Sequence, residues 1–397
     1  MKGYPEVDMA RRTLMGPGPS NVDPRVLRVM ATPLVGHLDP QFVEIMNETK
    51  KLLQLVFETK NELTIPISGT GSAGMEAGLC NLVEEGDEVL VAVNGYFGDR
   101  LCEIAKRCGA TLRRIDVPWG QVFEPEQIES ALKEHRTDLL AIVHAETSTG
   151  ALQPLEEIAA MAHQHGALVL VDAVTSLGGV RVEIDRWDVD ACYSGTQKCL
   201  SCPPGLSPIT FGPRATQKLR DRAQAVQSWY LDLSLIEKYW GQERSYHHTA
   251  PISMNYALYE ALRLIQEEGL VERCARHELN SKALQEGLEA MGMKLFAPRA
   301  YRLPSLTSVR VPDGVDEARV RGKLLTEFNI EIGGGLGALK GKIWRMGLMG
   351  YSSRRENVML ALTALESALR AQGFSTSPGA GPEAAVEVFR QAEETSA

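Results

Sequence analysis

The sequence predicts an α/β protein, with a large domain built on a mainly parallel sheet and a smaller α+β domain at the C-terminal side. Between about residues 60 and 211, short strands that are apolar throughout alternate with longer amphipathic helices. This is the pattern of a parallel sheet that helices cover on both faces. After about residue 250, a long helical stretch precedes shorter strands and a further helix, an order that favours a separate α+β unit.

Six segments of the large domain are predicted to be strands, because each is a short run rich in apolar and β-branched residues. The stretches between them, such as residues 98–109 and 155–166, have the apolar spacing of helices. The second of these ends at Gly166, a residue type that favours helix C-termini. In chain order the predicted strands are LTIPI (63–67), EVLVAV (88–93), LLAIVHA (139–145), ALVLVDA (167–173), DACYSG (190–195) and SPITF (207–211).

A helical stretch over residues 255–292, which crosses Gly269, leads from the large domain into the smaller one. Residues 374–382 are rich in Gly, Pro and Ser and are predicted to be a flexible linker. Residues 383–397 fit either a docked amphipathic helix or a frayed tail. The remaining predicted elements are strands at 306–312, 329–334 and 342–347 and a helix at 355–373. The chain is thereby divided into an N-terminal arm (1–15), a large domain (16–265), a small domain (266–373) and a linker with a tail (374–397).

The composition excludes several classes of protein. With 42 Lys and Arg against 51 Asp and Glu, the 397-residue chain has a net charge of −9, so it has no bulk attraction for nucleic acid or anionic membranes. The apolar run at 167–171 is far shorter than the ~20 residues that span a bilayer. Seven cysteines and a start without an apolar region do not suggest a secreted, disulfide-bonded protein. We expect a cytoplasmic enzyme with no nucleic-acid or membrane partner.

The segment Gly69–Gly74, GTGSAG, follows a predicted strand and opens a predicted helix. Its letters match G-x-G-x-x-G, so a nicotinamide dinucleotide site is one interpretation. However, the next strand ends at Asn94 and Gly95, without the acid that would hold a ribose, and no Walker-type lysine follows. Backbone N–H groups at a helix start bind anions, and here a single phosphate fits better than a pyrophosphate. The remaining interpretation is a glycine-rich turn that allows close packing.

Asp172 and Lys198 both follow predicted strands, and the carboxyl ends of parallel strands share one edge of a sheet. A helix cap or salt bridge is the ordinary role for such an aspartate, and a surface position is the ordinary one for a lysine. The N–H groups of the segment Gly69–Gly74 form a candidate phosphate-binding cup. Together with this phosphate cup, Asp172 and Lys198 match the needs of pyridoxal phosphate. Its phosphate needs amide donors, its ring nitrogen needs an anion, and its aldehyde needs an amine.

At these residues the sequence resembles the class V, fold-type I aminotransferases, and especially the alanine–glyoxylate/serine–pyruvate aminotransferase group. The resemblance extends from Gly16 to about Leu369. It rests on the motifs MGPGPSNV (15–22), ISGTGSAGMEA (67–77), NGYFGDR (94–100), HAETSTGALQP (144–154), LVDAVTSLGG (170–179), SGTQKCLSCPPG (194–205), YHHT (246–249), GGGLG (333–337) and KIWRMGLMG (342–350).

The resemblance implies a role for each matching residue. Lys198 would bind pyridoxal 5′-phosphate covalently and then move the proton from the substrate Cα to C4′ of the cofactor. Asp172 would hold the ring nitrogen, Phe97 would stack on the ring, and Thr147 would lie near its hydroxyl. Arg345 would bind the substrate carboxylate bidentately, with the backbone of Gly16 beside it. The phosphate contacts would come from Thr70, Gly71, Ser72 and Gln197, although Ser72 stands where some relatives have His.

The YHHT segment implies a homodimer with shared active sites, because in the family Tyr246 and Thr249 reach the neighbouring subunit's phosphate. His247 and His248 also suggest a metal site, but adjacent side chains on an extended segment point apart, so no metal is predicted. Cys199 and Cys202 form a C-x-x-C pair without a second pair of ligands. We therefore expect them to pack beside the lysine loop.

The predicted activity is a ping-pong transamination in which alanine or serine gives its amino group to glyoxylate or a similar small 2-oxo acid. Three alternatives stay open. (S)-Ureidoglycine–glyoxylate aminotransferase suits the same motifs. A cysteine desulfurase-like lyase needs a mobile cysteine, and here the last one is Cys274, on the long helical stretch. A nicotinamide-dependent dehydrogenase would rest on Gly69–Gly74 alone.

Overall fold

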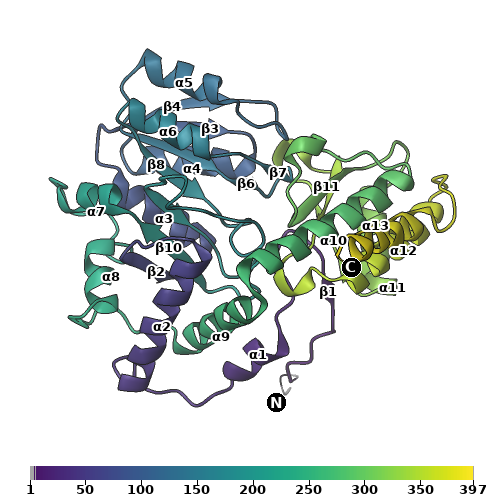
Figure 1. Ribbon diagram of the computed structural model, residues 1–397, viewed down its shortest axis with the longest axis horizontal. Helices are drawn as coiled ribbons and strands as arrows, with labels where there is room; N and C mark the ends of the chain where they lie inside the picture. Colours follow the sequence, from purple (N-terminus) through teal and green to yellow (C-terminus); the bar gives the residue numbers. More distant parts are fainter. Residues whose placement is uncertain (1–3, 5, 397) are drawn as a thin grey trace.

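A computed structural model describes residues 4 and 6–396; residues 1–3 and 5 of the predicted arm and residue 397 of the tail lie outside the described residues. A seven-stranded sheet forms the centre of the molecule (Figure 1). Its neighbouring strands are parallel except at β10, which is antiparallel to both of its neighbours. The strand order is β2 (Leu63–Ser68), β10 (Leu206–Phe211), β9 (Ala191–Tyr193), β8 (Leu168–Asp172), β5 (Leu139–Val143), β3 (Glu88–Val93) and β4 (Thr111–Asp116).

Helices cover both faces of this sheet. Along β3, Val89, Val91 and Val93 join a core with α3 and α4, whereas Leu90 and Ala92 join a core with α5 and α6. Side chains that alternate between two buried faces explain why the strands are apolar throughout. The helices of this part are α1 (Pro24–Val29), α2 (Pro40–Val56), α3 (Gly71–Leu82), α4 (Tyr96–Arg107), α5 (Pro125–Glu134), α6 (Glu156–Gln164), α7 (Pro213–Arg220), α8 (Leu233–Trp240) and α9 (Ile252–Glu268), and a short hairpin joins β6 (Ala145–Glu146) to β7 (Ala151–Leu152).

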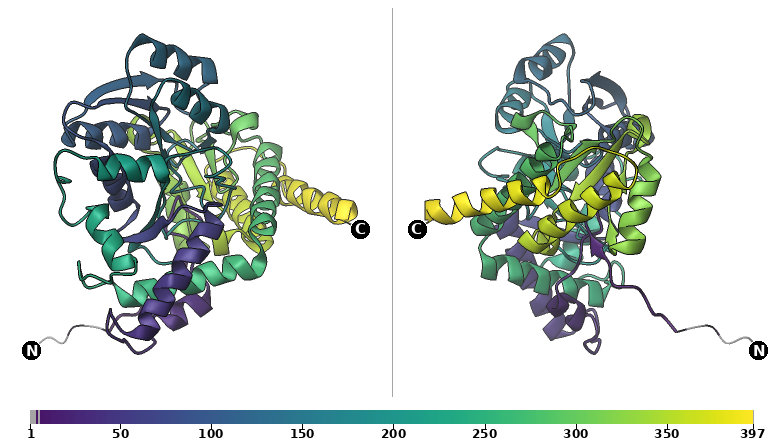
Figure 2. Two further views of the ribbon diagram at one scale, coloured as in Figure 1. Left: turned by 60° about the vertical axis from the view of Figure 1, so that its left-hand side comes forward. Right: turned by 90° about the vertical axis from the view of Figure 1, so that its right-hand side faces the viewer.

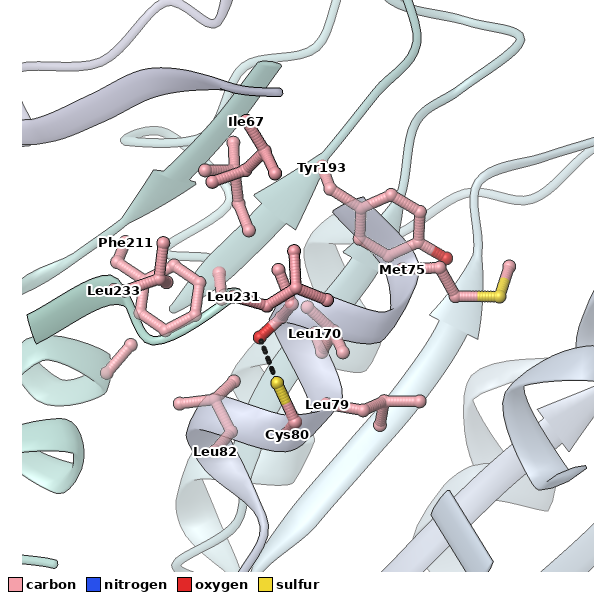
Figure 3. Close-up of a cluster of buried hydrophobic side chains, with 14 of the residues drawn as sticks. Ile67, Met75, Leu79, Cys80, Leu82, Leu170, Tyr193, Phe211, Leu231 and Leu233 are labelled. Atoms are coloured by element: carbon pink, nitrogen blue, oxygen red, sulfur yellow. Dashed lines mark hydrogen bonds between the residues drawn. The ribbon is translucent and has the colours of Figure 1, made fainter. Parts of the chain in front are cut away.

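Helix α3 packs closely against the sheet because glycines face it. A Cβ atom on Gly74 would lie only 1.9 Å from the Ser207 Oγ, and one on Gly78 would lie 3.0 Å from the Leu170 Cδ1. Apolar side chains of α3 then meet those of the sheet in one buried cluster, which Figure 3 shows around Tyr193 and Leu170. This packing fixes the start of α3 at the edge where β8 and β9 end.

The C-terminal part has a core of its own, which includes Met15, Trp344, Leu362 and Phe389. Near the start of the chain, β1 (Thr13–Leu14) pairs in parallel with β12 (Ile330–Glu331) and so joins this part. The other elements are the antiparallel strands β11 (Leu306–Arg310), β14 (Ile343–Gly347) and β13 (Gly333–Gly334), the helices α10 (Leu270–Ala290), α11 (Glu317–Glu327), α12 (Arg355–Arg370) and α13 (Ala380–Ser396), and the 3-10 turns η1 (Arg299–Tyr301), η2 (Gly337–Leu339) and η3 (Gly350–Ser352).

Helix α13 docks on α10, with its C-terminal end projecting from the body of the protein (Figure 2). The contact is close: a Cβ on Gly287 of α10 would lie 2.8 Å from the Gly381 carbonyl oxygen. Ala385, Val388 and Phe389 are buried in the same core. Residues 380–382, predicted as linker, are therefore the first residues of a docked helix, while the domain boundaries after residues 15, 265 and 373 stay predictions.

Two further elements differ from the sequence prediction. Strand β4, TLRRID, was not predicted because it is polar; it lies at the edge of the sheet, where Arg114 pairs with Asp99 and Asp116. The long helical stretch is two helices, since Gly269 between them has a φ of 87°, a conformation that favours glycine.

We expect Gly74→Ala to destabilise the protein by about 1–3 kcal/mol, because the added methyl group overlaps the Ser207 side chain in a packed core. The matched control is Gly322→Ala in α11, where a Cβ meets nothing within 4 Å. That change should stabilise the protein by about 0.5–1 kcal/mol through helix propensity. Urea unfolding of the two variants measures the contrast, and equal effects would contradict the close packing of α3.

Candidate active site

The structure brings three of the predicted motifs together at one edge of the sheet. Asp172 is the last residue of β8, and the loop that carries Lys198 follows β9. A Cβ on Gly71, the first residue of α3, would lie 3.2 Å from the Val174 Cγ2 and 3.6 Å from the Gly195 Cα. The start of α3, the end of β8 and the lysine loop are therefore in contact.

Asp172 is buried, with 2% of its surface exposed. The Tyr193 hydroxyl donates a hydrogen bond of 2.7 Å to one carboxylate oxygen, and the Val174 N–H donates one of 2.9 Å to the other. Burial is the main influence on this group and raises its pKa to about 6. Tyr193 was not predicted; it stands opposite Asp172 in the pairing of β8 with β9, a register that the sequence does not specify.

Lys198 is also buried, with 8% exposure. Burial and then the charge of Arg345 lower its pKa to about 8, so a much larger fraction of the amine is neutral near pH 7.5 than for an ordinary lysine. Its amine donates to the Pro17 carbonyl oxygen. Gly18 has a φ of +103°, and a Cβ there would lie 2.6 Å from the Lys198 Cδ. A glycine in this loop is thus needed beside the lysine.

Arg345, on β14, is buried and donates to two carbonyl oxygens, those of Gly334 (2.8 Å) and Thr147 (3.2 Å). Burial lowers its pKa to about 10. Carbonyl partners orient the guanidinium without neutralising it, so it keeps the capacity to bind a carboxylate. Gly16 lies beside β14. The two backbones are so close that a Cβ on Gly347 would come within 2.1 Å of the Gly16 carbonyl oxygen.

The loop Gly16–Gly18 lies between the side chains of Arg345 and Lys198. A Cβ on Gly333 would lie 2.4 Å from the Pro17 Cδ and 3.6 Å from the Arg345 Nη2. The carbonyl of Pro17 meets the Lys198 amine at its other side. The predicted carboxylate-binding residue and the predicted reactive amine therefore face the same short segment.

A second buried acid, Glu146, was missed in the sequence. Its carboxylate accepts hydrogen bonds from the Phe97 N–H (3.1 Å) and from the N–H and hydroxyl of Ser148 (2.9 and 2.6 Å). Burial raises its pKa to about 7. Glu146 thereby fixes the start of α4, where Phe97 lies, to the segment of Thr147, whose hydroxyl bonds that of Thr175. Its position in HAETSTG gave no signal that separates it from a surface glutamate.

The predicted phosphate cup at the start of α3 consists of Thr70, Gly71, Ser72 and Gln197. Thr70 does not cap the helix with its side chain. The Ala73 N–H donates to the Thr70 carbonyl oxygen at 2.7 Å, and the N–H groups before it in the first turn suit an anion. Gln197 has a buried Oε1 without a partner among the described residues. A Cβ on Gly195 would lie 3.0 Å from that atom and 3.5 Å from the Gly71 nitrogen. A turned amide supplies a donor, so the residues of this cup fit a phosphate.

Tyr246 and Thr249 do not lie with the buried predicted site residues of the same chain. Both are solvent exposed, Tyr246 to 64%. Its ring lies 5.3 Å from that of His37, between centroids. Lys198, Asp172 and Arg345 are buried by contrast. The two exposed residues thus lie on the surface of the chain.

The two histidines between them do not point apart as expected. The Nδ1 atoms of His247 and His248 are 2.7 Å from one another, because Trp229 stacks on His247 (4.4 Å between centroids) and the Ser68 hydroxyl holds His248 at 2.7 Å. The segment is irregular and not an extended strand, so alternation does not apply. Among residues 4 and 6–396, no group of three or more His, Cys, Asp or Glu side chains that could hold a metal is found.

We expect Asp172→Asn to stabilise the cofactor-free protein near pH 8 by on the order of 2–3 kcal/mol. The folded-state pKa of Asp172 lies above its usual value of 3.8, so ionisation costs folding energy above about pH 6, and this cost fades as the pH falls towards 4. Asparagine can keep both hydrogen bonds. Urea unfolding near pH 8 and near pH 4.5 measures the difference, and a gain that is equal at both pH values would contradict the burial argument.

Comparison with known proteins identifies the family of the chain. Residues 18–358 match the family profile described as Aminotransferase class-V. The chain is 44% identical to the (S)-ureidoglycine–glyoxylate transaminase of Bacillus subtilis, over 99% of both chains. It is 40% identical to the alanine–glyoxylate aminotransferase of Rattus norvegicus, over 92% of this chain and 89% of the rat protein.

The fold agrees as well. The crystal structure of an alanine–glyoxylate aminotransferase from Nostoc sp. superposes with a TM-score of 0.92 at 53% identity, covering 93% of this chain and 98% of that one. The ureidoglycine–glyoxylate aminotransferase structure from Bacillus subtilis gives 0.95 at 45% identity, over 97% and 100%. The predicted class and fold are confirmed, and so is pyridoxal phosphate as the cofactor that they imply. The chain belongs to the class V aminotransferases, and it is a fold-type I, pyridoxal-phosphate-dependent transaminase.

Proposed function

We propose that the protein transfers the amino group of alanine or serine to glyoxylate or a similar small 2-oxo acid by a ping-pong mechanism. The observation that carries the amino-acid chemistry is that Arg345 and Lys198 both lie beside the same segment, Gly16–Gly18. The Arg345 guanidinium suits a substrate carboxylate, and the Lys198 amine suits the Cα next to that carboxylate. Alanine as the donor is supported by the name of the relative from Rattus norvegicus. Glyoxylate appears in the names of both groups of relatives, which supports it as the acceptor.

The proposed residue roles follow from the site. Arg345 binds the substrate carboxylate and so orients the Cα–H bond. Lys198 takes the proton from Cα and returns it, which its lowered pKa favours. Asp172, held by Tyr193, would balance the positive charge of the cofactor's ring nitrogen, and Phe97 and Thr147 would border the ring and exclude water. When bound, pyridoxal phosphate supplies an electron sink and carries the amino group between half-reactions.

Ureidoglycine is the second candidate donor. The relative from Bacillus subtilis that carries this name aligns over 99% of this chain. Ureidoglycine shares the α-amino acid portion that Arg345 and Lys198 would bind, so these two residues do not distinguish the donors. Differences in the remaining pocket change selectivity by about 1–3 kcal/mol, which requires direct measurement.

The other two alternatives have less support. A desulfurase-like lyase needs an accessible cysteine nucleophile, whereas six of the seven cysteines are buried and Cys274 is half-buried on α10. Burial raises the pKa of Cys199, nearest to Lys198 in sequence, to about 11, so its thiol is a poor nucleophile. The Gly69–Gly74 segment, on which a dehydrogenase would rest, includes Gly74, whose role is packing against Ser207.

We further propose a homodimer in which Tyr246 and Thr249 complete the partner's phosphate cup. Thr70 and Ser72 of the cup are exposed in the single chain. The Tyr246 ring contacts that of His37, and its neighbour His247 contacts Trp229 and Tyr230. Exposed apolar side chains stand close to His37 in sequence and at the two residues that contact His247: Leu34 (66%), Leu38 (46%), Trp229 (62%) and Tyr230 (43%). Exposed apolar groups of this kind mark interaction surfaces. A second copy that covers them also supplies what the open cup lacks.

The cytoplasm stays our proposed location. All seven cysteines are free thiols, as in reducing compartments. None of the described helices combines the length and apolar character that a bilayer crossing requires.

Steady-state assays with glyoxylate should give the highest kcat/KM with alanine or serine. Lys198→Ala should lower kcat by at least about a thousandfold, because the group that moves the Cα proton is lost. Lys218→Ala, which removes a lysine paired with Asp87 outside the site, is the matched control. Preference for ureidoglycine would select the second candidate, and full activity of Lys198→Ala would refute the proposed mechanism.

Hybrid dimers test the shared site. One subunit carries Lys198→Ala and the other Tyr246→Ala with Thr249→Ala. If Tyr246 and Thr249 serve the partner, one site of each hybrid has both defects and the other has none, so the hybrid should regain about half of the wild-type activity. Dimers purified through two different tags allow the measurement. A hybrid as inactive as its parents would show that these residues serve their own subunit.

A further inference from the structure

Arg100 contacts the predicted phosphate cup through Ser72. It lies one helical turn after Phe97 on α4. Its Nη1 donates a hydrogen bond of 3.2 Å to the Ser72 hydroxyl, in the first turn of α3. Its Cζ lies 5.0 Å from the centroid of the Phe97 ring and 5.4 Å from that of Tyr96. The guanidinium is therefore held between two aromatic rings and the cup.

The acids next to Arg100 on α4 are bound to other arginines. Asp99 pairs with Arg114 at 2.7 Å, and Glu103 pairs with Arg107 at 2.9 Å. The positive charge of Arg100 instead stabilises the ionised form of Asp172. It lowers the pKa of that carboxyl, although burial, the larger influence, raises it. The positive charge of Arg100 is thus directed at the cofactor edge of the sheet.

The cup needs such a charge. Thr70, Gly71, Ser72 and Gln197 are all neutral, while a phosphate monoester carries about two negative charges near pH 7. The helix start supplies only about half a positive charge. Arg100 and Ser72 also line a cavity of about 480 Å³ between α3 and α4, together with Arg107.

We propose that Arg100 binds the phosphate of pyridoxal phosphate and is the cup's counter-charge. The guanidinium would donate to a phosphate oxygen from the position where it now meets Ser72, and stacking on Phe97 would keep it in place. This inference rests on the proposed site residues and adds to them a cation from the same chain.

Cofactor binding separates this role from a structural one. The full-length protein, freed of cofactor, is titrated with pyridoxal phosphate and with pyridoxal, which lacks the phosphate, and binding is followed by absorbance. For Arg100→Gln we expect the affinity for pyridoxal phosphate to fall about 10- to 100-fold, since charge-assisted hydrogen bonds are lost. The affinity for pyridoxal should stay within about twofold of wild type, because Arg100 then has no phosphate to bind.

Arg107→Gln is the matched control, because Arg107 lies on the same helix, lines the same cavity and is paired with Glu103. It should leave both affinities unchanged. An unchanged affinity of Arg100→Gln for pyridoxal phosphate would overturn the inference. Equal losses for both ligands would also overturn it, since they would show that Arg100 acts only through Phe97.

Arg100→Lys decides the matter if the Gln variant does not fold. Lysine keeps the charge but not the planar fork of the guanidinium. A loss of affinity for pyridoxal phosphate below the 10- to 100-fold expected for Gln, with the affinity for pyridoxal unchanged, supports the inference. Equal changes for both ligands contradict it. A wild-type protein that binds neither ligand would instead refute the proposed cofactor site, and that result is distinct from a failure of Arg100 alone.

Discussion

The structure depends on the burial of four ionisable groups at one edge of its sheet. Lys198 and Arg345 are kept from water by the same packing that buries Asp172 and Glu146. Burial disfavours the charged form of each, which lowers the pKa of the two bases and raises that of the two acids. Such groups are tolerated only when partners are positioned for them. Here Tyr193, Ser148 and the Pro17 carbonyl act as those partners.

The strands and the main chemical groups were predictable because they depend on local signals. Apolar runs located β2, β3, β5, β8 and β10, and the carboxyl-end rule placed Asp172 near Lys198. Strand β4 was missed because an edge strand needs little apolar surface. Helix α13 was left open because its buried face is complementary to α10, which is distant in sequence.

The partners of the site were not predictable for a different reason. Tyr193 depends on the register between two strands, and Glu146 depends on the turn that places its side chain under the Phe97 N–H. The contact between His247 and His248 depends on Trp229, almost twenty positions earlier in the chain. In each case a residue type that is common on surfaces takes its role from tertiary contacts. Sequence spacing alone does not contain that information.

The pairing of β1 with β12 has a consequence for the order in which the protein can be completed. Thr13 and Leu14 stand opposite Ile330 and Glu331, and the N–H groups of Thr13 and Met15 donate to the carbonyl oxygens of Asn329 and Glu331. Met15 is buried among side chains from the last third of the chain. During synthesis, the large sheet can therefore assemble while the beginning of the polypeptide still lacks its neighbours. The segment around β1 can pair only after the ribosome has synthesised β12. A product truncated before β12 would therefore leave β1 and Met15, next to the Gly16–Gly18 loop of the candidate site, without their partners.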